Sequence, residues 1–161
     1  MHAHKMMKCI ANTNVLNHEI ISAALLSSIK SLKYAPEYYK KNYTHCKNAI
    51  EYCITAKDAK LMKHVHNKEI LCNKKLFKKM VEEGIFECMN YADISLQSDA
   101  VYVKELLKIN AKNVIPYIDA KLRDNEQIMN VAQKTYKLAF YFASDRLFKK
   151  MVIITHVDHA H

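Results

Sequence analysis

Apolar side chains recur along this chain at the three- and four-residue spacing of a helix face. The clearest stripes are Ile20, Ile21, Ala24 and Leu25; Cys46, Ala49, Ile50 and Cys53; Ile70, Leu71, Leu76, Phe77, Met80 and Val81; Val101, Val103, Leu106, Leu107 and Ile109; and Ile128, Met129, Ala132 and Leu138. Such spacing places each stripe on one side of an α-helix. The pattern predicts a series of amphipathic helices that hold about 70% of the residues.

Residues that favour helix ends stand between these stripes. The predicted N-caps or turn residues are Asn17, Asn73, Asp99 and Asp124. Gly84 follows the third stripe at the position where a glycine commonly ends a helix. Pro36 and Pro116 each suit a first helical turn, because the backbone nitrogen makes no helical hydrogen bond there.

Aromatic residues follow the stripes at a constant distance. An apolar and an aromatic residue are 14 positions apart in four places: Ile20 and Tyr34, Phe77 and Tyr91, Val103 and Tyr117, and Ile128 and Phe142. A weaker copy spans Ile50 to His64. The last three aromatic residues are 26 and 25 positions apart, which indicates a repeat. We predict that each unit contains a helix of about eleven residues, a tight link and an aromatic-led helix of about eight to ten.

Two short helices cannot each bury an apolar face alone, whereas stacked pairs form a continuous core. The sequence therefore predicts an all-α, α-solenoid-like fold of stacked short helix pairs in a single domain, with the aromatic residues wedged between pairs. The predicted parts are an N-terminal capping segment at 1–15, with Met6, Met7 and Ile10; four to five helix-pair repeats at 16–148; and a C-terminal tail at 149–161. An ankyrin array is excluded, because its period of about 33 residues and its T-P-L-H-x-A phrase are missing.

The repeated phrase also resembles a known family. Its pattern is Asp-x-x-hydrophobic-hydrophobic, followed by Tyr-Ala-x-x-x-Leu-x-x-Asp. The closest stretches are LRDNEQI at 122–128 with FASDRL at 142–147, and YADISL at 91–96. This pattern is similar to short α-helical repeats of unknown function found in amoeba-infecting giant viruses and intracellular bacteria. The resemblance is clear in the C-terminal half and loose between 43 and 73, and the links hold fewer small residues and glycines than the family has. It implies a helical-repeat architecture and no catalytic residues.

The chain has one glycine among 161 residues, and this excludes several functional classes. No G-x-G-x-x-G turn and no P-loop can be written, and a β fold rich in tight turns is equally unsupported. No apolar run approaches the ~18 residues of a membrane span. The first residues also lack the apolar stretch of a secretory signal. We expect a cytoplasmic protein, and delivery into a host cell stays open.

Cysteine and histidine residues are the candidate metal ligands. The five cysteines are Cys9, Cys46, Cys53, Cys72 and Cys88. Their odd number and the absence of C-x-x-C favour free, mostly buried thiols in a reducing compartment. A loose group at His45, Cys46, Cys53, His64, His66 and Cys72 matches no standard zinc spacing. The terminal residues His2, His4, His156, His159 and His161 are of a kind that takes up Ni²⁺ or Cu²⁺ adventitiously. We expect no cofactor and no dedicated metal site.

Positive charge is concentrated in the N-terminal half. The chain carries 25 Lys and Arg against 16 Asp and Glu, a formal net charge of +9. Residues 1–80 hold 15 basic and 5 acidic side chains, whereas residues 81–161 hold 10 and 11. The candidate patch for an anionic partner comprises Lys57, Lys60, Lys63, Lys68, Lys74, Lys75, Lys78 and Lys79. Such an excess permits an anionic partner and is equally typical of a solubilising surface.

Several interpretations of this patch stay open: weak nucleic-acid binding, an acidic protein or anionic membrane surface, or no specific ligand. Tyr38, Tyr39, Tyr43 and Tyr52 lie upstream and offer rings for base stacking. Arginine, which base-edge recognition favours, occurs only at 123 and 146. No nucleophile elbow or oxyanion loop is evident, so the sequence predicts a non-enzymatic module that binds a protein partner. The resemblance alone implies a virus–host or bacterium–host context. Weak, non-specific nucleic-acid binding is the alternative.

Overall fold

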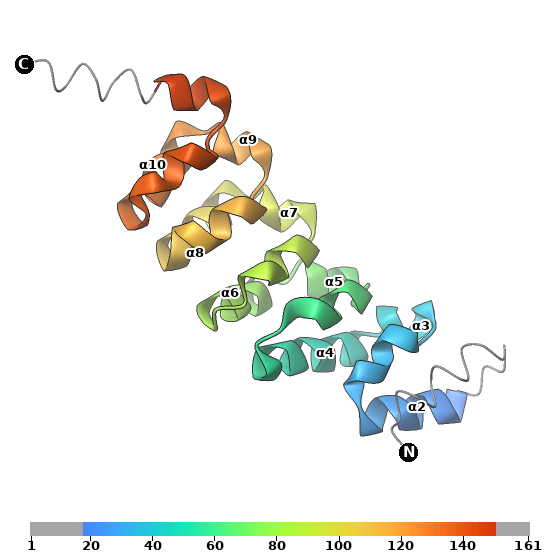
Figure 1. The fold of residues 1–161 in the computed structure, drawn as a ribbon. Helices are drawn as coiled ribbons and strands as arrows, with labels where there is room; N and C mark the ends of the chain where they lie inside the picture. Colours follow the sequence, from blue (N-terminus) through green and yellow to red (C-terminus); the bar gives the residue numbers. More distant parts are fainter. Residues whose placement is uncertain (1–17, 151–161) are drawn as a thin grey trace, which may run out of the picture. The chain divides into compact units, whose positions relative to one another are not determined.

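The computed structural model describes residues 18–150, and these residues form helices joined by short links (Figure 1). Helices hold 81% of the described residues and none of these residues lies in a strand, which confirms the all-α class. The α-helices are α2 (His18–Ser27), α3 (Glu37–Lys41), α4 (Tyr43–Ala56), α5 (Lys68–Leu71), α6 (Lys74–Glu82), α7 (Ile94–Gln97), α8 (Ala100–Val114), α9 (Ala120–Arg123) and α10 (Glu126–Thr135), and residues 145–150 are also helical. The 3-10 helices are η1 (Ile29–Tyr34), η2 (Ala59–His64), η3 (Phe86–Tyr91), η4 (Ile115–Tyr117) and η5 (Lys137–Phe142).

The same order of elements recurs along the described chain. Each of α2, α4, α6, α8 and α10 is followed by a 3-10 helix and then by a short α-helical segment. The 3-10 helices end at Tyr34, His64, Tyr91, Tyr117 and Phe142, the aromatic positions that the sequence singled out. These residues close a 3-10 helix, so the prediction that they lead a second helix is wrong. The residue after each of them is extended, which ends the 3-10 helix there.

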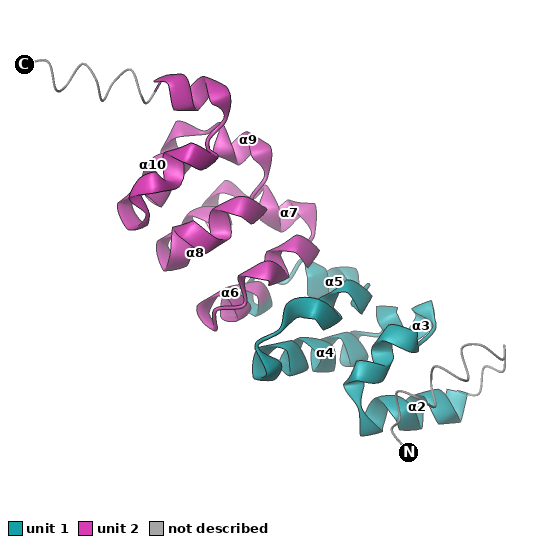
Figure 2. Cartoon of the chain, in the orientation of Figure 1, with its two compact units in different colours: residues 1–76 teal, residues 77–161 magenta. Residues whose placement is uncertain are grey.

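The chain divides into two compact units, residues 1–76 (unit 1) and residues 77–161 (unit 2), coloured teal and magenta in Figure 2. The boundary lies inside α6, so the predicted single domain stays a prediction. The capping segment at 1–15 and most of the tail at 149–161 lie outside the described residues.

The core of unit 1 forms where α4 packs against η1 and η2. The stripe of Cys46, Ala49, Ile50 and Cys53 on α4 is completely buried, as predicted. Leu32 from η1 and Met62 from η2 are buried as well. The two 3-10 helices also contact each other, so apolar side chains from three elements fill one interior.

The core of unit 2 is built mainly between α8 and α10, which lie side by side (Figure 2). Leu106 and Leu107 of α8 are buried, and so are Ile128 and Met129 of α10. The 3-10 helices contact one another in succession, η3 with η4 and η4 with η5. The two long helices also contact these 3-10 helices, α8 with η3 and η4, and α10 with η5.

Three predicted core positions are instead exposed: Val101 (73%), Ile109 (38%) and Leu138 (50%). The helical register changes at two breaks. Asn110 has a non-helical backbone that divides α8, and α10 ends at Thr135, before Leu138. Leu138 lies beyond the end of α10, and Ile109 directly precedes the break at Asn110. Val101 precedes both breaks and is two positions from the buried Val103, a spacing that places the two side chains on different sides of a helix.

The aromatic positions are less enclosed than the sequence predicts. Tyr34, Tyr91, Tyr117 and Phe142 are all half-buried. Tyr102, which the predicted register left outside the core, is only 3% exposed. The most buried aromatic residues of unit 2 are thus Phe77 on α6 and Tyr102 on α8, and not the residues at the 3-10 helix ends.

Asparagine and aspartate side chains cap most of the α-helices. Asn73 and Asp99 accept hydrogen bonds from the first turns of α6 and α8, as predicted. Asp124 lies in the turn between α9 and α10, which is one of the two roles predicted for it, and the neighbouring Asn125 caps α10. The sequence analysis did not select the further caps, Asn42, Asp58, Asn67, Asp93 and Asp119. Pro36 lies one position before α3, and Pro116 lies in η4, whereas Asn17 lies outside the described residues.

Two helices end in the same left-handed turn with different residues. After α6, Gly84 has φ +82° and donates to the carbonyl of Val81, while Ile85 donates to Met80. After α4, Lys57 has φ +52°, with equivalent bonds from Lys57 to Ile54 and from Asp58 to Cys53. Both sets of bonds form a Schellman motif, in which glycine is the residue with the least steric penalty.

Candidate functional site

The eight lysines of the predicted patch lie on four successive elements. Lys57 follows α4, Lys60 and Lys63 lie on η2, and Lys68 begins α5. Lys74, Lys75, Lys78 and Lys79 lie on α6, and the last two of them belong to unit 2. All are exposed except Lys78, which is half-buried.

Two of these lysines already pair with carboxylates of the chain. The Lys60 Nζ lies 3.5 Å from an Asp58 oxygen, and the Lys78 Nζ lies 3.2 Å from an oxygen of Glu105. Exposed pairs of this kind contribute little to stability, and they reduce the net charge offered to a ligand.

The tyrosines proposed for base stacking are only partly available. Tyr39 is 3% exposed, and the Lys30 Nζ lies 5.2 Å from the centre of the Tyr52 ring. Tyr38 (69%) and Tyr43 (41%) remain exposed. Two of the four rings are thus enclosed or covered by the chain itself.

A second group of cations gathers around His64 at the end of η2. Burial lowers the pKa of His64, and the nearby positive groups lower it further. The groups that exert this effect are Lys40, Lys63, His66 and Lys33. We call the five residues Lys33, Lys40, Lys63, His64 and His66 the basic cluster.

A single carboxylate lies within the basic cluster. The Oε2 of Glu37 is 2.8 Å from the Nδ1 of His66, and its Oε1 is 3.5 Å from the Nζ of Lys40. The hydrogen bond from His66 is the largest cause that lowers the pKa of Glu37. The Lys40 side chain is only 17% exposed, so its charge is largely committed to this contact.

The cysteines and histidines considered as candidate metal ligands do not converge within the described residues. The Cys46 thiol donates to the carbonyl of Lys40 (2.8 Å), and burial raises the pKa of Cys53 to about 11. His45 packs against the ring of Tyr39. Within residues 18–150, no three side chains of His, Cys, Asp or Glu are placed to hold a metal ion. Cys9 and the histidines of both termini lie outside this range.

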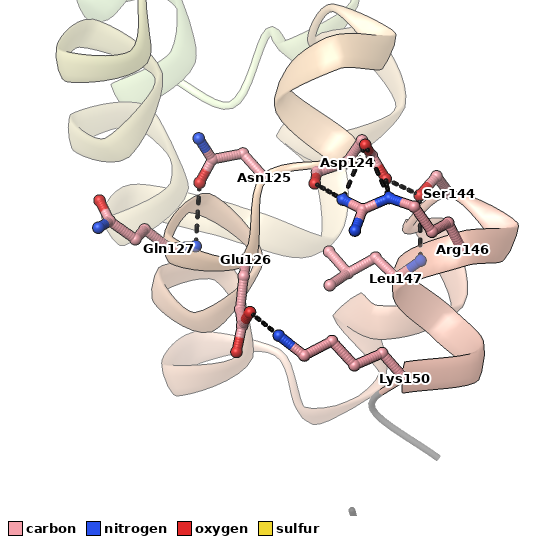
Figure 3. Close-up of polar contacts among 8 residues, drawn as sticks. All are labelled: Asp124, Asn125, Glu126, Gln127, Ser144, Arg146, Leu147 and Lys150. Carbon is pink, nitrogen blue, oxygen red and sulfur yellow. Dashed lines mark hydrogen bonds and ion pairs between the residues drawn. The ribbon is translucent and has the colours of Figure 1, made fainter. Parts of the chain in front are cut away.

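Polar contacts hold the last described helix to the link between α9 and α10 (Figure 3). Asp124 accepts hydrogen bonds from the Ser144 hydroxyl and from the Arg146 guanidinium, whose Nη2 lies 2.9 Å from Oδ2. Glu126 pairs with the Nζ of Lys150 at 2.6 Å. The Arg146 hydrogen bond is the largest cause that lowers the pKa of Asp124. We call Asp124, Ser144 and Arg146 the polar clasp. Its contacts connect two segments of the chain, which is a structural role.

Backbone hydrogen bonds also join successive short helices within each unit. In unit 1 the N–H of His66 donates to the carbonyl of Lys40 (2.8 Å). In unit 2 Asp119 donates to Gln97 (3.1 Å), and Ser144 donates to Arg123 (3.3 Å). The N-terminal end of one short helix is thus tied to the C-terminal end of the preceding one.

No protein-family model, curated protein or solved structure matches this chain. The resemblance to the viral and bacterial helical repeats therefore stays a prediction. Of the helices within 18–150, none has the length and apolarity needed to cross a membrane.

Of the basic cluster, the sequence analysis selected Lys63 for the lysine patch and His64 and His66 as candidate metal ligands, and it missed Lys33 and Lys40. Lys33 and Lys63 are 30 positions apart and each precedes the last residue of a 3-10 helix. The weak copy that ends at His64 is the signal that aligns them, because it places His64 opposite Tyr34. Nothing in the local sequence links Lys40 to either residue.

Proposed function

We propose that this chain is a non-enzymatic helical-repeat module that binds a protein partner on the exposed surface of its helices. The observation that carries the proposal is the recurring order of long α-helix, 3-10 helix and short α-helix. Stacked units of this kind offer extended surfaces and no inbuilt chemistry.

The joins between short helices support this proposal. Backbone bonds and buried apolar side chains fix the elements, while many of the polar side chains stay on the surface. A rigid array with variable surface residues suits recognition of another macromolecule. The resemblance to viral and bacterial repeats extends the proposal, by analogy alone, to a cytoplasmic role in virus–host or bacterium–host interaction.

A proximity experiment tests the protein-binding function. The chain is incubated in a lysate of its native source, cross-linked and recovered with and without nuclease. We expect a discrete protein to be recovered in both samples, with cross-links to residues within 18–150. Recovery of nucleic acid, and of proteins only when nuclease is omitted, would overturn the proposal in favour of the alternative.

The alternative is weak, non-specific nucleic-acid binding, which the exposed Lys74, Lys75 and Lys79 on α6 favour. Contact with about four or five phosphates of a single strand predicts a slope of about −3 for log affinity against log salt. Reversal of Lys74, Lys75, Lys78 and Lys79 to Glu should then abolish binding. The matched control reverses four exposed lysines of unit 2, Lys121, Lys134, Lys137 and Lys149, and should change little.

A further inference from the structure

We propose that the partner presents a carboxylate-rich segment, and that the basic cluster of unit 1 is the surface that binds this segment. The inference rests on the protein-binding function proposed above and adds the chemistry of the partner. It concerns residues that the sequence patch did not contain, with the exception of Lys63.

The fold brings the basic side chains of the cluster together from three elements. Lys33 and Lys63 are each the next-to-last residue of a 3-10 helix, and the two helices, η1 and η2, contact each other. The backbone bond from His66 to Lys40 brings α3 to the segment that follows η2. Residues about 30 positions apart therefore form one positive surface.

The cluster already holds one carboxylate of its own chain. Glu37 places one oxygen against His66 and the other against Lys40. Lys33 and Lys63 are exposed, and within residues 18–150 neither pairs with a carboxylate. The surface therefore has the chemistry for carboxylates and keeps two cations for a ligand from outside.

The same surroundings favour protein carboxylates over nucleic acid. Single strands bind through base stacking as well as charge. The Lys33 Nζ lies over the Tyr34 ring, 4.6 Å from its centre, and so occupies one face of that ring. Unit 1 also contains no arginine, the residue that contacts phosphates in a bidentate manner.

Fluorescence anisotropy with a labelled oligo-glutamate peptide tests the inference on the full chain. The variant Lys33→Glu/Lys63→Glu should weaken binding about tenfold or more, because attraction becomes repulsion at the contact. The variant Lys47→Glu/Lys108→Glu makes the same change in net charge at two exposed lysines outside both the basic cluster and the predicted patch. It should weaken binding about twofold or less, because salt screens distant charges. Circular dichroism melts establish that both variants fold. The variant Lys33→Gln/Lys63→Gln removes the two positive charges without adding negative ones.

Each other outcome overturns the inference. Equal losses in the two Glu variants would mean that net charge alone attracts the peptide. Tighter binding of a labelled oligothymidylate, lost in the same Lys33 and Lys63 variant, would assign the surface to nucleic acid. Absence of peptide binding would reject the carboxylate partner and leave the module itself standing, because the lysate experiment detects a partner on any face.

Discussion

Ser31 is a buried polar residue of η1, and its hydroxyl has no hydrogen-bond partner within the described residues. It lies in η1 next to Leu32, which is also fully buried. A buried hydroxyl without a partner loses its hydration and gains nothing in return.

Ser31→Ala should therefore raise the free energy of unfolding by about 1 kcal/mol. Urea denaturation followed by circular dichroism measures this change. The exposed Ser27 is the control, and Ser27→Ala should stay within about 0.5 kcal/mol. A loss of stability in Ser31→Ala would show that the hydroxyl has a partner.

Tyr102 and Tyr117 provide the test of which aromatic residues support the core. Tyr102→Ala should cost about 3–5 kcal/mol, because it empties a fully enclosed site on α8. Tyr117→Ala should cost less, about 1–2 kcal/mol, because that ring is half-buried. The 14-residue spacing found in the sequence places Tyr117, and not Tyr102, between the helix pairs, and therefore predicts the reverse order. A larger loss of stability for Tyr117→Ala in urea melts would support that prediction.

Asp124 gives the polar clasp a defined pH dependence. Its folded-state pKa lies below the ordinary value, so the clasp stabilises the fold above that ordinary pKa. The contribution of the clasp to the free energy of unfolding is lost as the pH falls through the lowered pKa of Asp124. Arg146→Ala should raise the pKa of Asp124 in an NMR titration and weaken this acid dependence. An unchanged Asp124 pKa in Arg146→Ala would contradict the assignment.

At the end of a helix, a single residue can decide how favourable the turn that stops the helix is. Lys57 and Gly84 occupy the same left-handed position after α4 and α6. A lysine there carries a steric cost that a glycine does not. No atom outside the adjacent backbone lies within 4 Å of a Cβ built on Gly84, so its backbone angle alone decides the effect of a substitution.

Lys57→Gly should stabilise the protein by about 1 kcal/mol, and Gly84→Ala should destabilise it by a similar amount. The control is Lys47→Gly inside α4, which should cost about 1 kcal/mol through helix propensity. Thermal and urea unfolding measure all three. A destabilised Lys57→Gly would mean that contacts of the lysine outweigh its backbone strain.

The elements also show how far the sequence analysis reaches. Within an uninterrupted helix such as α4, apolar spacing identified the buried residues correctly, because one register applies throughout. Asn110 interrupts α8 directly after Ile109, and Ile109, which the spacing assigned to the core, is 38% exposed at this break. The basic cluster lay beyond the sequence analysis because packing between η1 and η2, and not spacing along the chain, brings Lys33 and Lys63 together.

At the scale of the molecule, the two units differ in charge. Unit 1 holds 13 basic and 5 acidic residues, and unit 2 holds 12 and 11. Both units contain ion pairs, such as Lys40–Glu37 in unit 1 and Arg146–Asp124 in unit 2, but only unit 1 has a large excess of like charges that repel one another. Added salt weakens both effects.

Salt should therefore stabilise unit 1 and leave unit 2 unchanged or slightly weaker. Hydrogen exchange at low and high sodium chloride measures this residue by residue. We expect the amides of α4 to gain protection and those of α10 to gain none. A uniform change across both units would contradict the prediction.

The backbone joins between short helices have an evolutionary consequence. The bonds His66–Lys40, Asp119–Gln97 and Ser144–Arg123 use main-chain atoms, which every residue except proline can supply. Mutation can therefore replace the side chains at these joins without removing the hydrogen bonds themselves. Selection can make one stretch of such a chain strongly basic and leave another nearly neutral while the scaffold persists. New binding specificities can arise in this architecture by changes of surface residues alone.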